Sequence, residues 1–286
     1  WEEVSCPAFP EGEEASVQEL WALESGGADQ PGRLWAGTIP GGLFRSDDHG
    51  QSWELVRSLW DHPGRAKWFG GGADEPAIHS ICVHPQRSTE IVVGVSCGGA
   101  WLTRDDGASW EQIAHGMRAD FLPEEQQFEP DSQDPHLIVR CPAQPDRLWT
   151  QHHCGIFRKD GDAAWEEITT APVSAFGFAV AVHPQDPDRA WFVPAVKDQC
   201  RVPVDAKVVV QRTNDGGQSF EVQSDGLPQS HAYDLVFRHA LAIDASGDRL
   251  AFGSTTGGLW LTQNGGDRWE QQALRLPPVY VVKWSS

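Results

Sequence analysis

Imidazole side chains recur in this sequence at positions that could build one chemical site. His79, His136 and His239 occupy equivalent places in three short apolar segments, and His152 and His153 stand side by side. Imidazole nitrogens bind Zn²⁺ and related divalent ions, and they exchange protons near neutral pH. We therefore predict an acid–base site or a divalent-metal site, with His79, His136 and His239 as the metal ligands. No HxH or HExxH spacing accompanies them, so the prediction depends on the fold setting these residues in register.

Two polar loops would add charged groups to the same place. One loop is an insertion at residues 194–205, and the other precedes His239. A glycoside hydrolase needs two carboxyl groups in different environments, and both loops contain carboxylates. The carboxyl candidates are Glu19, Asp134, Asp198, Asp205 and Asp234. The predicted catalytic set is His79, His136, His152, His153, His231, Asp234, Arg201 and Asp205.

A repeated motif predicts the elements that would position these groups. The pattern Ser/Thr-x-Asp-x-Gly-x-Ser/Thr-aromatic occurs at residues 46–53, 103–110 and 213–220, with weaker copies at 262–269 and 158–165. Asp and hydroxyl side chains bond turn amides, Gly supplies a positive φ, and the aromatic ring packs beneath the turn. We interpret these Asp residues as structural staples of a turn and not as catalytic groups.

The period of the motif predicts a β-propeller. The closing aromatic residue recurs at intervals of 49 to 57 residues, and each interval has room for four short strands. In the second period the strands are residues 79–84, 90–96, 99–104 and 109–113. In each of the other periods an inner strand is followed by a range that holds the remaining three strands. These pairs of ranges are 18–24 and 33–56, 136–141 and 147–168, 178–183 and 189–222, and 239–244 and 249–271.

The two ends of the chain carry single predicted strands. Residues 1–4 are expected to form an outer strand of one blade, and residues 279–284 an inner strand of another. A lone strand leaves its backbone hydrogen bonds unmade. We therefore expect a single all-β propeller domain over residues 1–286, with five whole blades and a natural N-terminus that is missing. The complete ring would have seven blades; a six-bladed ring would have to pair residues 1–4 with 279–284.

The motif resembles the Asp-box, or BNR, repeat of sialidase-like propellers. The phrases at residues 37–44 and 251–260 are similar to a widespread bacterial family whose members carry the names glycosyl hydrolase or exo-alpha-sialidase. The resemblance implies seven blades and a carbohydrate-directed hydrolase. A true sialidase also needs three arginines and a Tyr–Glu pair, whereas only Tyr233 and Tyr280 are present and Arg201-Val202-Pro203 falls late in the chain. We therefore expect no authentic sialidase activity.

Register within a propeller would bring the histidines to one face. Equivalent positions of successive blades lie on a ring around the central axis, so His79, His136 and His239 are expected near the channel mouth. His152-His153 replaces the small residues found at the same hairpin in other blades. Two long loops, residues 57–77 and 115–132, would lie nearby as lids. Their aromatic residues would stack on a sugar or pack on the rim: Trp60, Trp68, Phe69, Phe121 and Phe128.

Composition limits the class of partner. There are 22 basic and 41 acidic residues, which gives a net charge of −19 and disfavours binding to nucleic acid or to an anionic membrane. The six cysteines form no CxxC pair and are expected to be free thiols in a reducing, cytoplasmic compartment. No signal peptide is visible. We expect a monomer.

Three functional hypotheses remain open from the sequence. The first is a carbohydrate-directed hydrolase that acts at the channel mouth. The second is a metal-dependent enzyme or lyase that uses the histidines of the same face, and a divalent ion would then be its cofactor. The third is a non-catalytic propeller that binds a carbohydrate, another small molecule or a protein on that face.

Overall fold

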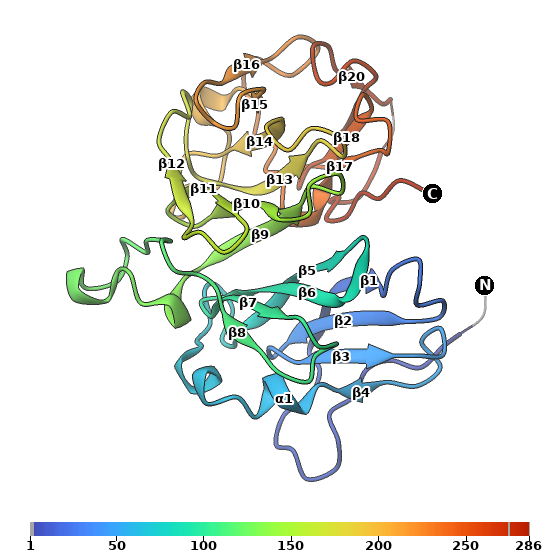
Figure 1. The fold of residues 1–286 in the computed structure, drawn as a ribbon. Helices are drawn as coiled ribbons and strands as arrows, with labels where there is room; N and C mark the ends of the chain where they lie inside the picture. The colour runs from blue at the N-terminus through green and yellow to red at the C-terminus, as the bar shows by residue number, and fades with distance from the viewer. Residues whose placement is uncertain (1–2, 274, 286) are drawn as a thin grey trace. The chain divides into compact units, whose positions relative to one another are not determined.

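The computed structural model describes residues 3–273 and 275–285, and its regular secondary structure is almost entirely antiparallel β-strand (Figure 1). Five four-stranded sheets follow one another along the chain, and in each sheet the strands pair in sequence order. We call each sheet a blade and number the blades along the chain. The chain divides between Ile138 and Val139 into two compact units, which are described separately below.

The first unit contains two complete blades. The first blade consists of β1 (Glu19–Ser25), β2 (Leu34–Ile39), β3 (Leu43–Ser46) and β4 (Glu54–Leu55). The second consists of β5 (Ala77–His84), β6 (Arg87–Ser96), β7 (Gly99–Thr103) and β8 (Glu111–Gln112). The connecting loops contain α1 (Arg57–Trp60), η1 (Pro63–Lys67), η2 (Glu124–Gln126) and η3 (Pro130–Ser132).

The unit boundary falls inside β9 (Pro135–Arg140), the inner strand of the third blade. That blade continues with β10 (Arg147–His152), β11 (Gly155–Asp160) and β12 (Glu166–Ile168). The fourth blade consists of β13 (Gly177–Val182), β14 (Ala190–Pro194), β15 (Val210–Thr213) and β16 (Glu221–Gln223), with η4 (Val204–Ala206) in its insertion. The fifth consists of η5 (Arg238–Ala240), β17 (Leu241–Ile243), β18 (Leu250–Gly253), β19 (Leu259–Thr262) and β20 (Glu270–Gln271).

The five predicted four-stranded sheets are confirmed, and the predicted end strands are not. Residues 279–284 form no strand; Val279 and Val282 donate separate backbone hydrogen bonds, to Ser254 at 2.9 Å and to His239 at 2.8 Å. Glu3 and Val4 also lie outside any strand, and the other half of that predicted strand, residues 1–2, lies outside the described residues.

The start of the fifth inner strand also differs from the prediction. The strand predicted at residues 239–244 begins only at Leu241. His239 lies instead in η5, where the Ala240 N–H donates to the Phe237 carbonyl at 2.9 Å and closes a tight turn. His239 therefore does not share the strand geometry of His79 and His136.

The repeated motif forms the turn between the third and fourth strands of a blade, which we call the staple turn. In the second blade, Thr103 Oγ1 accepts from the Gly107 N–H at 2.9 Å and donates to Asp105 at 2.8 Å. Asp105 also accepts from the Ser109 N–H at 2.8 Å and from its hydroxyl at 2.6 Å. The same bonds recur in the turns at residues 46–52 and 213–219. The turn at 262–268 has Asn264 in place of Asp and keeps all of them except the bond from the last hydroxyl, since residue 268 is Arg. The structural interpretation is confirmed for Asp48, Asp105 and Asp215, whereas Asp160 of the copy at residues 158–165 is paired with Arg147.

Aromatic side chains fill the blades, as the motif predicts. The closing residues Trp110, Trp165 and Trp269 are buried, and Trp53 and Phe220 are half-buried. Trp35, Trp149 and Trp191, on the second strands of their blades, have no exposed surface. Large-ring burial at each repeat gives every blade its own apolar core.

A glycine sets the spacing between the first two blades. A Cβ added to Gly37 in β2 would lie 2.3 Å from the carbonyl oxygen of Ile78 in β5. No side chain fits there, so the two sheets pack with backbone against backbone. Among the described residues, no helix combines the length and the apolar character that crossing a lipid bilayer requires.

Candidate functional site

The repeat position that carries the predicted histidines lies near the start of the inner strands. His79 in β5 and His136 in β9 belong to the first unit, and their side chains are 0% and 2% exposed. The second unit has Phe178 at this position in β13, also 2% exposed, and the half-buried His239 in η5. The side chains at this position are therefore packed among protein neighbours.

Asp134 and His136 form a buried pair in the first unit. His136 Nε2 lies 3.7 Å from Asp134 Oδ2, and the other oxygen of the carboxylate accepts from the Ser96 hydroxyl and the Cys97 N–H, each at 3.2 Å. Asp134 is 1% exposed, and a Cβ added to Gly71 would lie only 3.2 Å from its Oδ2. A carboxylate held beside an imidazole in this way is suited to proton transfer.

His79, in the same unit, is tied to its neighbouring strand. Its Nδ1 lies 2.8 Å from the Ser80 hydroxyl, which accepts from the Ile138 N–H at 2.9 Å. The edge of the Trp21 ring also faces the imidazole, with centroids 6.1 Å apart. Glu19, the carboxyl candidate of the first blade, is exposed at the start of β1.

The adjacent histidines of the third blade have different surroundings. His152 is fully buried, its Nδ1 accepts from the Cys154 N–H at 3.1 Å, and its ring packs on Phe157 at 5.2 Å. These contacts stabilise the β10–β11 hairpin. His153 is half-buried and its ring lies edge-on to Phe176, with centroids 5.7 Å apart. Of the two, His153 is the better placed to reach a ligand.

An aromatic cluster with two arginines occupies the inner-strand start of the fourth blade. The Phe178 ring lies 5.4 Å from that of Phe176 and 5.2 Å from that of Phe237. The guanidinium carbons of Arg201 and Arg238 each lie 5.3 Å from the Phe178 centroid, which makes both of them cation–π partners of this ring. The predicted residues Arg201 and His153 thus lie on one cluster, and sequence reasoning gave no role to its aromatic members.

The remaining predicted loop residues are placed as follows. Asp234 accepts from the hydroxyls of Ser254, at 2.8 Å, and Thr256, so it holds the β18–β19 hairpin. His231 and Asp205 are exposed, and each has a φ of 54°. The Ala232 N–H donates to the Ala206 carbonyl at 3.0 Å, so the two loops are joined next to His231 and Asp205. Asp198 is paired with Arg201, whose Nε donates to it at 3.0 Å.

A metal ion would find part of a ligand set in the first unit. Asp134 offers an oxygen and His136 a nitrogen on facing atoms 3.7 Å apart. Catalytic zinc sites use three protein ligands, with Zn–N bonds of about 2.0–2.1 Å. The pair therefore suits a divalent ion in donor type but supplies two of the three ligands.

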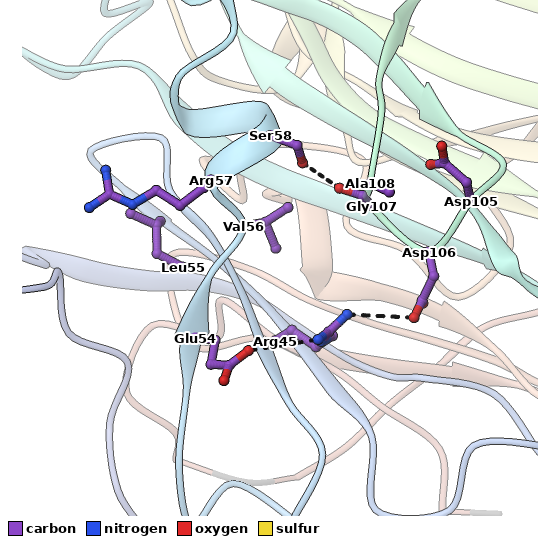
Figure 2. A pocket seen from close by; sticks show the side chains of 10 residues that line it. All are labelled: Arg45, Glu54, Leu55, Val56, Arg57, Ser58, Asp105, Asp106, Gly107 and Ala108. Atoms are coloured by element: carbon purple, nitrogen blue, oxygen red, sulfur yellow. Dashed lines mark hydrogen bonds and ion pairs between the residues drawn. The ribbon is translucent and has the colours of Figure 1, made fainter.

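A separate cavity of about 280 Å³ lies on the staple-turn side of the first unit (Figure 2). It is lined by Arg45, Glu54, Leu55, Val56, Arg57, Ser58, Asp105, Asp106, Gly107 and Ala108. Arg45 lies between Glu54, at 3.7 Å, and Asp106, at 3.5 Å. The charges inside the cavity therefore largely compensate one another. No sequence pattern indicated this cavity, because it forms between β4 and a staple turn about fifty residues away.

Two fungal proteins match the chain over most of its length. An oligoxyloglucan-reducing end-specific xyloglucanase of Emericella nidulans is 24% identical over 264 residues, which cover 82% of this chain and 30% of that protein. A "probable oligoxyloglucan-reducing end-specific xyloglucanase" of Neosartorya fischeri is 26% identical over 270 residues, which cover 84% and 30%. The chain thus spans about a third of the length of these relatives. No protein-family model matches it.

Solved structures show the same fold. The GH74 xyloglucanase from Xanthomonas campestris superimposes with a TM-score of 0.58 at 21% identity, covering 85% of this chain and 37% of that one. An ancestral GH74 enzyme gives a TM-score of 0.61 at 14% identity, covering 90% and 33%. The β-propeller domain of Cps50 from Myceliophteria thermophila gives 0.54 at 8% identity, covering 85% and 64%.

The chain has a β-propeller fold. The fold predicted from the repeat is therefore confirmed, while the number of blades in a complete ring stays a prediction. The sequence relatives and two of the structural neighbours are glycoside hydrolases that carry the name xyloglucanase or GH74. The expected likeness to glycosyl hydrolase propellers is borne out at this level, and the relatives found are xyloglucanases.

Proposed function

We propose that this chain is a carbohydrate-directed, glycoside-hydrolase-like β-propeller that acts on a neutral polysaccharide of the xyloglucan class. The observation that carries the proposal is the match to two xyloglucanases over 82% and 84% of the chain. A β-propeller alone is compatible with many functions, so the fold adds little to this argument. The net charge of −19 suits a neutral ligand better than an anionic one.

Asp134 and His136 are the residues of the first unit that we assign to the chemistry. Glycoside hydrolysis requires a carboxyl group that gives or takes a proton at the glycosidic oxygen or at water. Asp134 is held by two hydrogen bonds and lies beside an imidazole, so its orientation is fixed before substrate arrives. Gly71 lies against this carboxylate, since a Cβ added there would be 3.2 Å from Oδ2, and it must shift to admit a sugar.

In the second unit, the cluster around Phe178 is the surface that we assign to ligand binding. Arg201 has 40% of its side chain exposed, and its guanidinium is fixed by Asp198 and by the Phe178 ring. Such a group can donate several hydrogen bonds to sugar hydroxyls with little loss of side-chain entropy. His153, on the neighbouring Phe176, would contribute a further polar edge.

The test is a release assay for new reducing ends. The purified protein is incubated with xyloglucan, with an unsubstituted β-glucan and with a sialoside. We expect activity on xyloglucan and none on the sialoside. Asp134→Asn should lower the rate about 100-fold or more, because proton transfer by a positioned side chain contributes that much. Asp244→Asn, which alters a surface turn in the fifth blade, is the control and should retain activity. Xyloglucan that stays intact with active controls would reject the proposal.

A metal-dependent reaction at the same pair is the second candidate, and it is favoured by the facing oxygen and nitrogen of Asp134 and His136. Metal analysis of the purified protein separates the two candidates. A stoichiometric divalent ion whose removal abolishes activity supports metal dependence, whereas full activity after chelation rejects it.

We also propose that the staple turns are Asp-box repeats of the BNR kind. Four turns share the bonding of a hydroxyl residue to the Gly and to the Asp or Asn that follow it, and this agrees with the motif from which the resemblance was drawn. We also propose that the protein is cytoplasmic and monomeric. Their tests are fractionation of the native host and the mass of the protein in solution.

A further inference from the structure

The aromatic residues of the two long loops divide into packed and exposed groups. Trp60 and Trp68 are 9% and 8% exposed, so they pack on the rim of the first unit. Phe69, Phe121 and Phe128 are 38%, 42% and 62% exposed. None of the exposed rings belongs to the residues that we assign above to the hydrolase chemistry. An exposed aromatic ring offers an apolar face that a sugar ring can cover.

Phe128 is held in place by a buried glutamine. The Gln133 side-chain amide donates to the carbonyl of Gln127 at 2.9 Å and to that of Glu129 at 3.0 Å, the two residues that flank Phe128. Gln133 has no exposed surface. Its backbone carbonyl accepts from the Gly99 N–H, at the start of β7, at 2.9 Å. The ring is therefore presented by a fixed backbone that is anchored to the second blade.

The loop that carries Phe69 is fastened to the loop that carries Phe128. Lys67 at the end of η1 forms an ion pair of 2.9 Å with Asp131 in η3, and the Phe69 N–H donates to the Cys97 carbonyl at 3.2 Å. Both rings thus stand on segments tied to the same blade. A binding surface built this way loses little conformational entropy when a ligand arrives.

The charge of the surface selects the class of ligand. Glu124, Glu125 and Glu129 are exposed around Phe128. Carboxylates repel phosphate groups, anionic polysaccharides and acidic membranes, and they accept hydrogen bonds from hydroxyl groups. A neutral pyranose chain matches both properties, because its C–H faces bury an aromatic ring and its hydroxyl groups bond carboxylates.

We propose that Phe128, together with Phe69, is a stacking platform for a neutral polysaccharide chain. The choice of a polysaccharide rests on the proposed function, but the platform requires no hydrolysis. Its role is to hold polymer, so it should affect binding of long chains and leave the reaction on short oligosaccharides unchanged.

The test is affinity electrophoresis of the full chain in gels that contain xyloglucan, with polygalacturonate as the anionic comparison. Phe128→Ala should weaken xyloglucan binding roughly tenfold, and Phe128→Trp should retain it, since burying a ring face gives a gain of this order. Gln133→Leu should weaken binding to a similar degree, because it frees the backbone on both sides of Phe128. Val222→Ala removes another exposed apolar group, from β16 in the second unit, and is the control.

The outcomes separate this proposal from the proposed function. Wild-type binding to xyloglucan that falls with Phe128→Ala and returns with Phe128→Trp supports the platform, even if no hydrolysis is found. Binding that is unchanged in Phe128→Ala overturns it, even if xyloglucan is hydrolysed. A wild-type protein that binds no neutral polysaccharide, but binds a basic protein through Phe128, also overturns it.

Discussion

His136 Nε2 lies 3.7 Å from Asp134 Oδ2, and both side chains are buried in the first unit. The carboxylate has two further donors, the Ser96 hydroxyl and the Cys97 N–H. An arrangement that serves packing alone would gain little from a buried charge, because desolvation offsets much of the attraction. The cost is expected where a group takes part in chemistry.

The first prediction separates the structural and chemical contributions of Asp134. Asp134→Ala should lower the free energy of unfolding by about 1–3 kcal/mol, because two buried donors lose their acceptor. Asp134→Asn keeps an acceptor oxygen and should fold with a smaller loss, yet lack activity. Urea unfolding and the reducing-end assay, run on both variants, check this. Equal activity in Asp134→Asn and the wild-type protein would show that the carboxylate has no chemical role.

The second prediction concerns the aromatic residue of the staple turn. Trp110→Ala should lower the free energy of unfolding by about 3–5 kcal/mol, because it empties a buried site between the hairpin and the blade. Trp110 is 8% exposed, whereas Trp284 is 37% exposed, so Trp284→Ala is the matched control and should cost much less. Thermal denaturation of both variants gives the comparison. Equal melting temperatures for the two would contradict the structural role of the motif.

The third prediction follows from the charge of the staple turns. The hydroxyls of Ser52 and Ser109 donate to Asp48 and Asp105 and lower the pKa of each carboxyl from 3.8 to about 2. A carboxyl whose pKa is lower in the folded state stabilises the fold above its unfolded pKa. That stabilisation is lost as the pH falls from about 4 to about 2.

Urea unfolding across this range checks the third prediction. Stability should fall steadily in the wild-type protein and less steeply in Asp105→Asn, which has no carboxyl to protonate at that turn. Parallel curves for the two proteins would mean that Asp105 does not contribute to the pH dependence.

The fourth prediction concerns the contact between the first two blades. Gly37→Ala should destabilise the protein by about 1–3 kcal/mol or more, because its Cβ would lie 2.3 Å from the Ile78 carbonyl oxygen and the sheets would have to separate. Gly155→Ala is the matched control, since its Cβ would meet its first neighbour at 3.5 Å. Denaturant midpoints compare them. A Gly37→Ala protein as stable as Gly155→Ala would contradict the close packing of these blades.

Much of the fold could be predicted because the turns of each repeat are formed by residues that are close together in the sequence. The bonds from Thr103 to Gly107 and from Asp105 to Ser109 lie within seven residues, so a short motif specifies them. Alternating apolar residues then place the strands on either side. The predicted strand at residues 279–284 failed because a strand needs a partner with a full ladder, which an apolar pattern cannot reveal.

The candidate site was harder to predict because its members meet through tertiary contacts. Repeat register placed His79 and His136 correctly on inner strands, but their burial depends on residues elsewhere, such as Trp21 and Ser96. The clamp that Gln133 forms around Phe128 also escaped notice, since a lone Gln in a loop has no sequence signature.

The most direct test of the central claim is a product analysis of xyloglucan oligosaccharides in heavy-oxygen water. A carbohydrate-directed hydrolase breaks the glycosidic bond and places one solvent oxygen on the new reducing end. The account predicts shorter oligosaccharides that carry the heavy oxygen with the wild-type protein and their loss with Asp134→Asn. Oligosaccharides that remain at full length and unlabelled, with a protein that is folded and a control hydrolase that is active, would contradict it.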